Sequence, residues 1–130
     1  MRKQPRWVDR LVVDAVHLDL VREHGGMQGT RDEGALEAAL TRPRQRWADG
    51  DDPDLATLAA AYAFGLARNH AYHDGYKRIA FVTMTVFLRL NGRKIDAAEE
   101  EVVAVMLELA DGTLAEDALA EWIRSHSTAG

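Results

Sequence analysis

The sequence predicts a single all-α domain, a compact bundle of about six helices. Apolar residues recur at intervals of three and four along most of the 130 residues, which is the spacing of one helical face. Glycine, proline and helix-capping residues interrupt this spacing between the segments. Runs that alternate apolar and polar residues, which would indicate strands, are weak. We therefore expect residues 1–130 to fold around one core.

The first two predicted helices flank a glycine-rich turn. The first spans roughly Val8 to Glu23 and ends at Gly25-Gly26, because glycine readily adopts the left-handed conformation that closes a helix. The second begins with a capping box that runs from Thr30 to Glu33. We expect Pro43 to end it, because proline lacks a backbone N–H. The apolar residues assigned to the inner face of the first helix are Leu11, Val12, Ala15, Val16 and Leu18.

The third predicted helix carries the longest apolar stripe, so we expect it to lie at the centre of the bundle. Asp52 is a suitable cap, and Pro53 fits the first turn, where its missing N–H costs little. The helix is expected to end near Asn69-His70. Its stripe consists of Leu55, Leu58, Ala59, Tyr62, Ala63 and Leu66.

The last three predicted helices follow a short polar loop. The fourth begins at Lys77 or Arg78 and stops at Asn91-Gly92; its β-branched residues leave a strand as the alternative. The fifth spans roughly Ala97 to Leu109. The sixth follows a second capping box, from Thr113 to Glu116, and we expect residues 125–130 to be frayed.

Composition excludes several classes of function. The formal net charge is −5, which disfavours broad, sequence-independent binding to nucleic acid. The chain has no cysteine, so disulfides, thiolate metal sites and cysteine nucleophiles are excluded. No apolar run approaches the ~20 residues of a membrane span. We expect a cytoplasmic protein that contacts neither a membrane nor nucleic acid.

The loop between the third and fourth helices contains the residues best suited to chemistry. Asp74-Gly75 is a turn signal, and Gly75 lets the backbone approach a ligand closely. The next helix offers unsatisfied N–H groups that attract phosphate, and Lys77 and Arg78 add two cations there. His70 is a candidate general base, and the Asp74 carboxylate is a candidate magnesium ligand. A purely structural polar connection between two helices remains the alternative.

The segment from His70 to Arg78 resembles the signature of the Fic/Doc superfamily. In that signature a histidine is followed by an aromatic, an acidic and a small residue, then by asparagine and a basic pair. The resemblance extends over most of the chain and implies the helical Fic/Doc fold. It is carried by Gly25-Gly26, Gly29 to Gly34, Leu36 to Leu40, Ala59 to Tyr62, Leu66 to His70 and Phe87 to Gly92.

Two positions favour the Doc branch over the Fic branch, which transfers AMP. The Fic branch has glycine where this chain has Lys77, and a second arginine where it has Phe81. The Doc resemblance implies a kinase toxin that uses ATP and Mg²⁺. It implies transfer of the terminal phosphate to a threonine of elongation factor Tu and arrest of translation. The implied partner is a Phd-type antitoxin whose C-terminal helix occupies a groove on the toxin.

The resemblance also implies residue roles. His70 would deprotonate the acceptor hydroxyl, and Asp74 would hold magnesium. Gly75, Lys77 and Arg78 would receive the phosphates. Tyr72 takes an aromatic position that we expect to pack inward.

Tyr76 departs from the signature, because the family has asparagine there. A phenol is larger than an amide and lacks the N–H donors that can bond a phosphate oxygen. We therefore expect weak nucleotide binding and poor phosphate transfer. A natural variant, a deliberate inactivation and selection against a toxic product are three possible origins of Tyr76.

Three alternatives to the kinase hypothesis remain open at the level of sequence. They are AMP transfer, a catalytically inactive antitoxin-binding module, and metal-dependent hydrolysis, for which the loop has few ligands. Elsewhere, Arg42, Arg44 and Arg46 form the densest basic cluster, either as a solvated face or as a docking surface for an acidic partner or nucleotide phosphates. Exposed apolar residues of the first two helices are candidates for the antitoxin groove.

Overall fold

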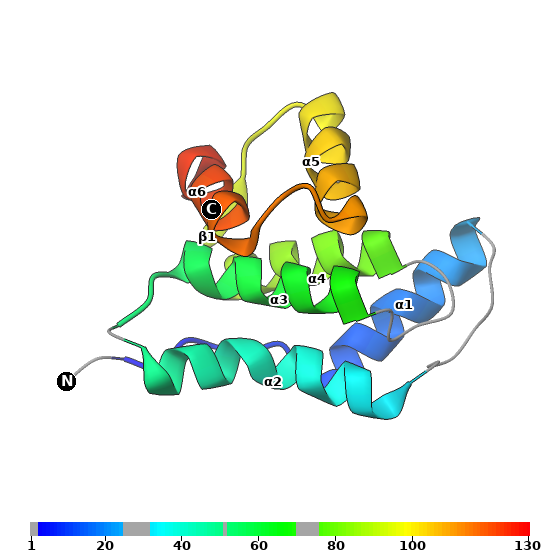
Figure 1. Ribbon diagram of the computed structural model, residues 1–130, viewed down its shortest axis with the longest axis horizontal. Coiled ribbons are helices and arrows are strands. Elements are labelled where there is room, and N and C mark those ends of the chain that lie inside the picture. Colours follow the sequence, from blue (N-terminus) through cyan, green and yellow to red (C-terminus); the bar gives the residue numbers. More distant parts are fainter. Residues whose placement is uncertain (1–2, 25–31, 51, 70–75) are drawn as a thin grey trace.

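The computed structural model describes residues 3–24, 32–50, 52–69 and 76–130 of the chain (Figure 1). This part contains six helices and a two-stranded antiparallel sheet, so the all-α prediction is confirmed. The elements in chain order are α1 (Arg10–His24), α2 (Glu33–Asp49), α3 (Leu55–Asn69), α4 (Tyr76–Leu90), β1 (Arg93–Ile95), α5 (Glu99–Asp111), α6 (Glu116–His126) and β2 (Ser127–Ala129).

Helix α3 lies at the centre, with α2 on one side and α5 and α6 on the other (Figure 1). Residues 58–63 have no exposed surface, as expected for a helix that is apolar on every side. Most of these residues are alanines, which allow neighbouring helices to approach closely. The predicted central position of this helix is therefore confirmed.

The contact between α2 and α3 depends on Gly65. A Cβ added to Gly65 would lie 3.2 Å from the Cα of Ala39 and 3.3 Å from its Cβ. Both residues are buried, so a larger residue at position 65 would push the two helices apart.

An aromatic cluster holds the N-terminal segment against this core. The indole of Trp7 stacks on Phe87 at 5.9 Å and meets Trp47 edge-on at 6.4 Å. The hydroxyl oxygen of Tyr62 accepts a hydrogen bond of 3.0 Å from the backbone N–H of Val8. Burial raises the pKa of this phenol, so Tyr62 remains neutral near pH 7. The residues before α1 are thus anchored on α3 and α4.

Pro43 does not end α2 as the sequence predicted; the helix continues to Asp49. Proline in a helix interior removes one hydrogen bond and costs ~3 kcal/mol. Packing on both sides of it offsets this cost, because Ala39 contacts α3 and Trp47 contacts Trp7. Pro43 itself is buried.

The predicted caps of three helices were wrong by two residues. Helix α2 is capped by Asp32, whose carboxylate accepts from the N–H of Ala35, instead of by Thr30, which lies outside the described residues. Helix α3 is capped by Asp54, whereas Asp52 has a left-handed φ of 61°. Helix α6 begins after Ala115 with no side-chain cap. The hydroxyl of Thr113, the expected cap, instead donates to the Asp111 carboxylate and to the carbonyl of Glu108 at the end of α5.

The inner face of α1 also differs from the prediction. Its buried residues are Val13, His17 and Val21, spaced four apart, whereas Leu11 is 79% exposed. Val12 is exposed as well. Both faces of this helix carry apolar residues, so the sequence pattern could not distinguish them.

The C-terminal tail is not frayed. Strand β2 pairs antiparallel with β1, in the register Arg93 to Ala129 and Ile95 to Ser127. The backbone N–H of Gly130 also donates to the carbonyl of Gly92 at 3.0 Å. Segments more than 30 residues apart supply the two strands, so neither strand could be recognised from its own sequence.

The segment from Tyr76 to Leu90 forms one continuous helix, α4, so the strand alternative for this segment is excluded. It begins at Tyr76, one residue before the earlier of the two predicted starts, and ends before Asn91 as predicted. The hydroxyl of Thr85 donates to the carbonyl oxygen of Phe81 at 2.9 Å, which accommodates a β-branched side chain within the helix. The side-chain amide of Asn91 donates to the carbonyl of Phe87 and closes the last turn.

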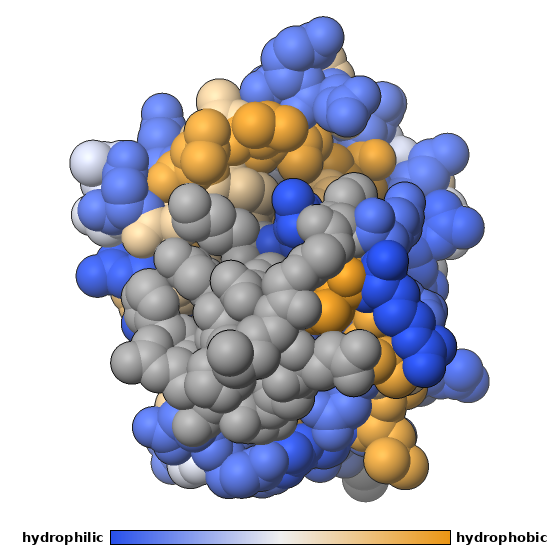
Figure 2. Space-filling model, turned by 90° about the vertical axis from the view of Figure 1, so that its right-hand side faces the viewer, coloured by the Kyte–Doolittle hydropathy of each residue, from blue (hydrophilic) through white to orange (hydrophobic). Residues whose placement is uncertain are grey.

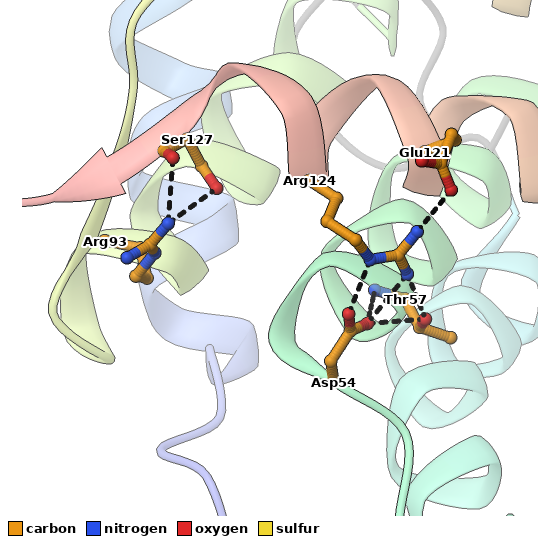
Figure 3. A network of polar contacts seen from close by, with 6 residues as sticks. All are labelled: Asp54, Thr57, Arg93, Glu121, Arg124 and Ser127. Atoms are coloured by element: carbon orange, nitrogen blue, oxygen red, sulfur yellow. Dashed lines mark hydrogen bonds and ion pairs between the residues drawn. The ribbon is translucent and has the colours of Figure 1, made fainter.

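An ion-pair network ties the start of α3 to α6 (Figure 3). The guanidinium of Arg124 donates to both carboxylate oxygens of Asp54, at 2.7 and 3.1 Å. It also contacts Glu121 at 2.6 Å. The same Asp54 carboxylate accepts from the backbone N–H and the hydroxyl of Thr57. One carboxylate thus serves both as helix cap and as tertiary contact.

We predict that Gly65→Ala lowers the free energy of unfolding by ~1 kcal/mol. Overpacking against Ala39 costs ~1–3 kcal/mol, and the higher helix propensity of alanine offsets ~1 kcal/mol of this. Urea denaturation measures the change. Gly34→Ala is the matched control, because Gly34 is exposed near the start of α2 and its added Cβ would only touch Asp32 at 3.4 Å. Equal stability of the Gly65 variant and the parent would contradict the packing argument.

We predict that Asp54→Asn lowers the free energy of unfolding by ~1 kcal/mol at pH 7. The side-chain hydrogen bonds from Arg124, followed by those from Thr57, hold the pKa of the Asp54 carboxyl below its usual range. A depressed carboxyl pKa stabilises the fold above the unfolded-state value of about 3.9, and this contribution is lost as pH falls below it. Asparagine keeps the capping oxygen but not the charge.

Urea denaturation is repeated from pH 5 down to pH 2. The difference in the free energy of unfolding between the parent and Asp54→Asn should become smaller as the pH falls. Asp19→Asn, at an exposed position of α1, should show no such difference. If the difference in the free energy of unfolding stays constant over this pH range, the ionised Asp54 carboxylate is not what stabilises the fold.

Candidate functional site

The loop predicted to bind phosphate connects α3 to α4, as expected. The two helices run antiparallel, so the end of α3 and the start of α4 lie at the same end of the molecule (Figure 1). His70, Asp74 and Gly75 lie outside the described residues, as does Tyr72. Their proposed roles therefore remain predictions, and the structure describes the two helix ends that carry the loop.

The start of α4 has the properties expected of an anion-binding helix terminus. The helix begins at Tyr76 and Lys77, and its first turn contains no acidic residue. The side chain of Arg78 is exposed, whereas Ile79 and Ala80 are fully buried. The buried pair fixes this turn on the core, while the side chain of Arg78 stays exposed and the turn keeps the free N–H groups of a helix N-terminus. This arrangement suits phosphate oxygens.

The end of α3 supplies a further cation that the sequence analysis did not single out. Arg68 is exposed, and its guanidinium lies 5.3 Å from the centroid of the Phe64 ring one turn earlier. The spacing of Phe64 and Arg68 by four residues, just before the loop, was the available signal.

An apolar groove lies beside the start of α4. It has a volume of about 530 Å³ and is bounded by α1, α4 and α5. Val103 and Leu107 on α5 are each 51% exposed. Figure 2 shows apolar side chains gathered in the upper part of this end of the molecule, where Figure 1 places α5. The lining residues are Leu20, Arg78, Phe81, Val82, Val102, Val103, Met106 and Leu107.

The antitoxin groove expected from exposed apolar residues of the first two helices stays a prediction, and the apolar groove described above is formed mainly by α4 and α5. Among the described lining residues, Leu20 is the one that comes from the first two helices, and the apolar residues Leu36 and Leu40 of α2 are buried. Helix α5 has apolar residues on two faces: Met106 and Leu109 are buried, while Val103 and Leu107 remain at the surface. This excess of apolar residues was the signal for a second contact surface.

The basic cluster around Pro43 does not form one face. Arg42 and Arg46 both reach Glu116 at the start of α6, Arg42 in a close ion pair and Arg46 at 3.8 Å. Arg44 turns to the other side, where its guanidinium lies 5.6 Å from the ring centroid of Trp7. All three side chains are exposed, as a solvated cluster predicts, but they are divided between two sides of α2.

Two negative findings concern the described residues alone. Within them, no group of three or more acidic or histidine side chains is close enough together to hold a metal ion. Nor does any described helix combine the length and hydrophobicity needed to cross a bilayer.

The fold and the position of the loop define a class of helical protein, and comparisons with known proteins identify the family. A family model described as Fic/DOC family matches residues 7–88, which include α1 to most of α4 and the loop. The chain belongs to the Fic/Doc family.

Two relatives are similar to this chain. One is the protein named Protein kinase doc of Escherichia phage P1, 30% identical over 110 residues, which are 85% of this chain and 86% of that protein. The other is the protein named Toxin Doc of Mycolicibacterium smegmatis (strain ATCC 700084 / mc(2)155). It is 45% identical over 75 residues, which are 56% of this chain and 57% of the relative. Both relatives are of the Doc type, in agreement with the resemblance found in the sequence.

Proposed function

We propose that this protein is a Doc-like toxin that transfers the terminal phosphate of ATP to a threonine or serine hydroxyl of a translation factor, elongation factor Tu. The single observation that carries the proposal is the start of α4, fixed by buried Ile79 and Ala80 and free of acidic residues. Relatives named as a kinase and as a toxin support the reaction class. Arrest of translation would account for toxicity.

The residues of the loop have defined parts in this reaction. His70 takes the proton of the acceptor hydroxyl. The backbone of Gly75 and the side chains of Lys77 and Arg78 bind the phosphates, and α4 contributes its free N–H groups. Asp74 holds Mg²⁺, which neutralises phosphate charge when bound. The exposed guanidinium of Arg78 fits this role, because it stands in the first turn of α4, which contains no acidic residue.

AMP transfer is the less favoured reaction. The second arginine of the AMP-transferring branch would stand at Phe81, a half-buried apolar side chain that lines the groove instead. A phenyl ring cannot bind a phosphate by charge, so the triphosphate has one guanidinium fewer on this side of α4.

Tyr76 is expected to impair the reaction. We predict that Tyr76→Asn raises the rate of phosphate transfer by about ten- to a hundredfold, since one hydrogen bond to a charged group contributes ~1.5–3 kcal/mol. The assay uses purified elongation factor Tu with ATP labelled at the γ or the α position. The γ label should transfer and the α label should not.

His70→Ala in the Tyr76→Asn background is the control and should abolish the γ signal. Transfer of the α label would establish AMP transfer instead. No transfer of either label by the chain or by Tyr76→Asn, combined with no binding of millimolar Mg-ATP, would favour a catalytically inactive antitoxin-binding module.

We further propose that the apolar groove receives the C-terminal helix of a Phd-type antitoxin. An amphipathic helix buries its apolar stripe in such a groove. The exposed residues Val103 and Leu107 would become buried on binding. Arg78 stands at the border of the groove, so a bound helix would lie next to the proposed phosphate site.

We predict that Leu107→Gln weakens antitoxin binding about tenfold or more, because burial of a leucine side chain contributes ~2 kcal/mol. The binding partner for the measurement is the protein of a short reading frame directly upstream of the gene, titrated calorimetrically. Leu11→Gln is the matched control, since Leu11 is an exposed leucine on α1 outside the groove. If both variants bind alike, the groove is not the antitoxin site.

A further inference from the structure

Two arginines lie over the ring of Phe64, on the side of the molecule formed by α2, α3 and α6. The guanidinium of Arg42 lies 5.2 Å from the ring centroid, and that of Arg68 lies 5.3 Å from it. Arg46 follows one turn after Arg42 on α2. We call Arg42, Arg46 and Arg68 the Phe64 basic surface. The proposed phosphate transfer uses none of them.

Positive charge exceeds negative charge on this surface. Arg42 and Arg46 share a single carboxylate, that of Glu116, whose side chain is only 12% exposed. No carboxylate of the described residues lies within ion-pair distance of Arg68. The whole chain has a net charge of −5, so this local excess of arginine contrasts with the rest of the molecule.

The guanidinium of Arg68 is held in position before any ligand binds. The Phe64 ring lies on one side of it, and Gly112 lies close by, where an added Cβ would stand 3.6 Å from Nη2. A guanidinium placed on an aromatic ring keeps its N–H groups available at the edges. Ordering it in advance lowers the entropy cost of binding a carboxylate.

A hollow of about 660 Å³ continues this surface between α2 and α6. Arg42, Arg46, Thr41 and Gln45 line it together with Glu116 and Asp49. The two acidic side chains would repel a compact polyphosphate that entered the hollow. An extended chain can instead place separate carboxylates at Arg68 and at the outer edge of Arg42.

The surface also lies next to the loop. Arg68 is two residues before His70 in the sequence, and α3 ends at Asn69. A polypeptide bound at Arg68 therefore lies beside the end of α3 that leads into residues 70–75.

We propose that the Phe64 basic surface docks an acidic segment of the protein that accepts the phosphate. The identity of that partner as the acceptor rests on the proposed function. The docking itself rests on the three guanidiniums, the single carboxylate that two of them share and the adjoining hollow. The surface determines which protein approaches the loop, because like-charged proteins are repelled and acidic segments are attracted.

The test uses a fluorescein-labelled octaglutamate peptide, without ATP or magnesium, and measures fluorescence anisotropy in 50 mM salt. The parent protein should bind the peptide, and 500 mM salt should abolish binding. Arg68→Gln should weaken binding about two- to fivefold, as expected for one exposed ion pair. Arg89→Gln is the matched control, because Arg89 is an exposed arginine at the opposite end of α4 from the loop.

Equal weakening by Arg68→Gln and Arg89→Gln, or no peptide binding, overturns the proposal. Binding of tripolyphosphate but not of the peptide would assign the surface to a nucleotide. If Arg68→Gln lowers the melting temperature, Arg46→Gln is the second variant, since its 3.8 Å ion pair is the longer one. Its effect must again exceed that of Arg89→Gln.

A second measurement connects docking to the reaction. In the γ-label assay the octaglutamate peptide should inhibit competitively against elongation factor Tu and not against ATP. Competition against ATP would overturn the docking of a protein. If neither the parent nor Tyr76→Asn transfers label, the proposed reaction fails, but peptide binding is still decided by the anisotropy measurement.

Discussion

Helix α3 is enclosed by its neighbours, and the rest of the structure depends on this burial. Residues 58–63 have no exposed surface, so α2, α4 and α6 must all be in place for α3 to be stable as a helix. Alanine provides the close approach along most of its length, and Gly65 provides it opposite Ala39. Close packing of this kind tolerates little change in volume.

The same burial determines how the loop is supported. The loop leaves the core at the end of α3 and re-enters it at the start of α4, where Ile79 and Ala80 are fully buried. The core therefore fixes the two helix ends that flank residues 70–75 in the sequence. The groove on α1, α4 and α5 adjoins this end of the core, and so does the Phe64 basic surface on α2 and α3. An apolar partner and an acidic partner can thus approach the loop over different elements.

The second half of the chain is attached by polar contacts as well as by the core. Arg124 reaches Asp54 at the start of α3, and β2 pairs with β1 after α4 (Figure 3). The ion pair joins residues that are 70 positions apart in the sequence, and the strand pairing joins residues that are more than 30 positions apart. They hold α6 over α3, where Glu116 meets Arg42 and Arg46.

Local patterns predicted the helices well but not their caps. At the start of α2 and of α3, two residues of capping type stand close together in the sequence, and the sequence analysis chose the earlier one. At α3, Asp54 has the additional contact with Arg124, which no local pattern contains. The same holds for Pro43, where α3 and Trp7 stabilise a helix that proline alone would end.

The sequence by itself determined the six helices, the central place of α3 and the position of the loop. These follow from the spacing of apolar residues and from local hydrogen bonding, both of which act over a few residues. It also contained the family signature from His70 to Arg78, with Tyr76 as its exception. Only the tertiary structure decided which apolar residues form the groove and which arginines gather at Phe64. The reason is that α5, α6 and the C-terminal strand reach their places through contacts between residues far apart in the chain.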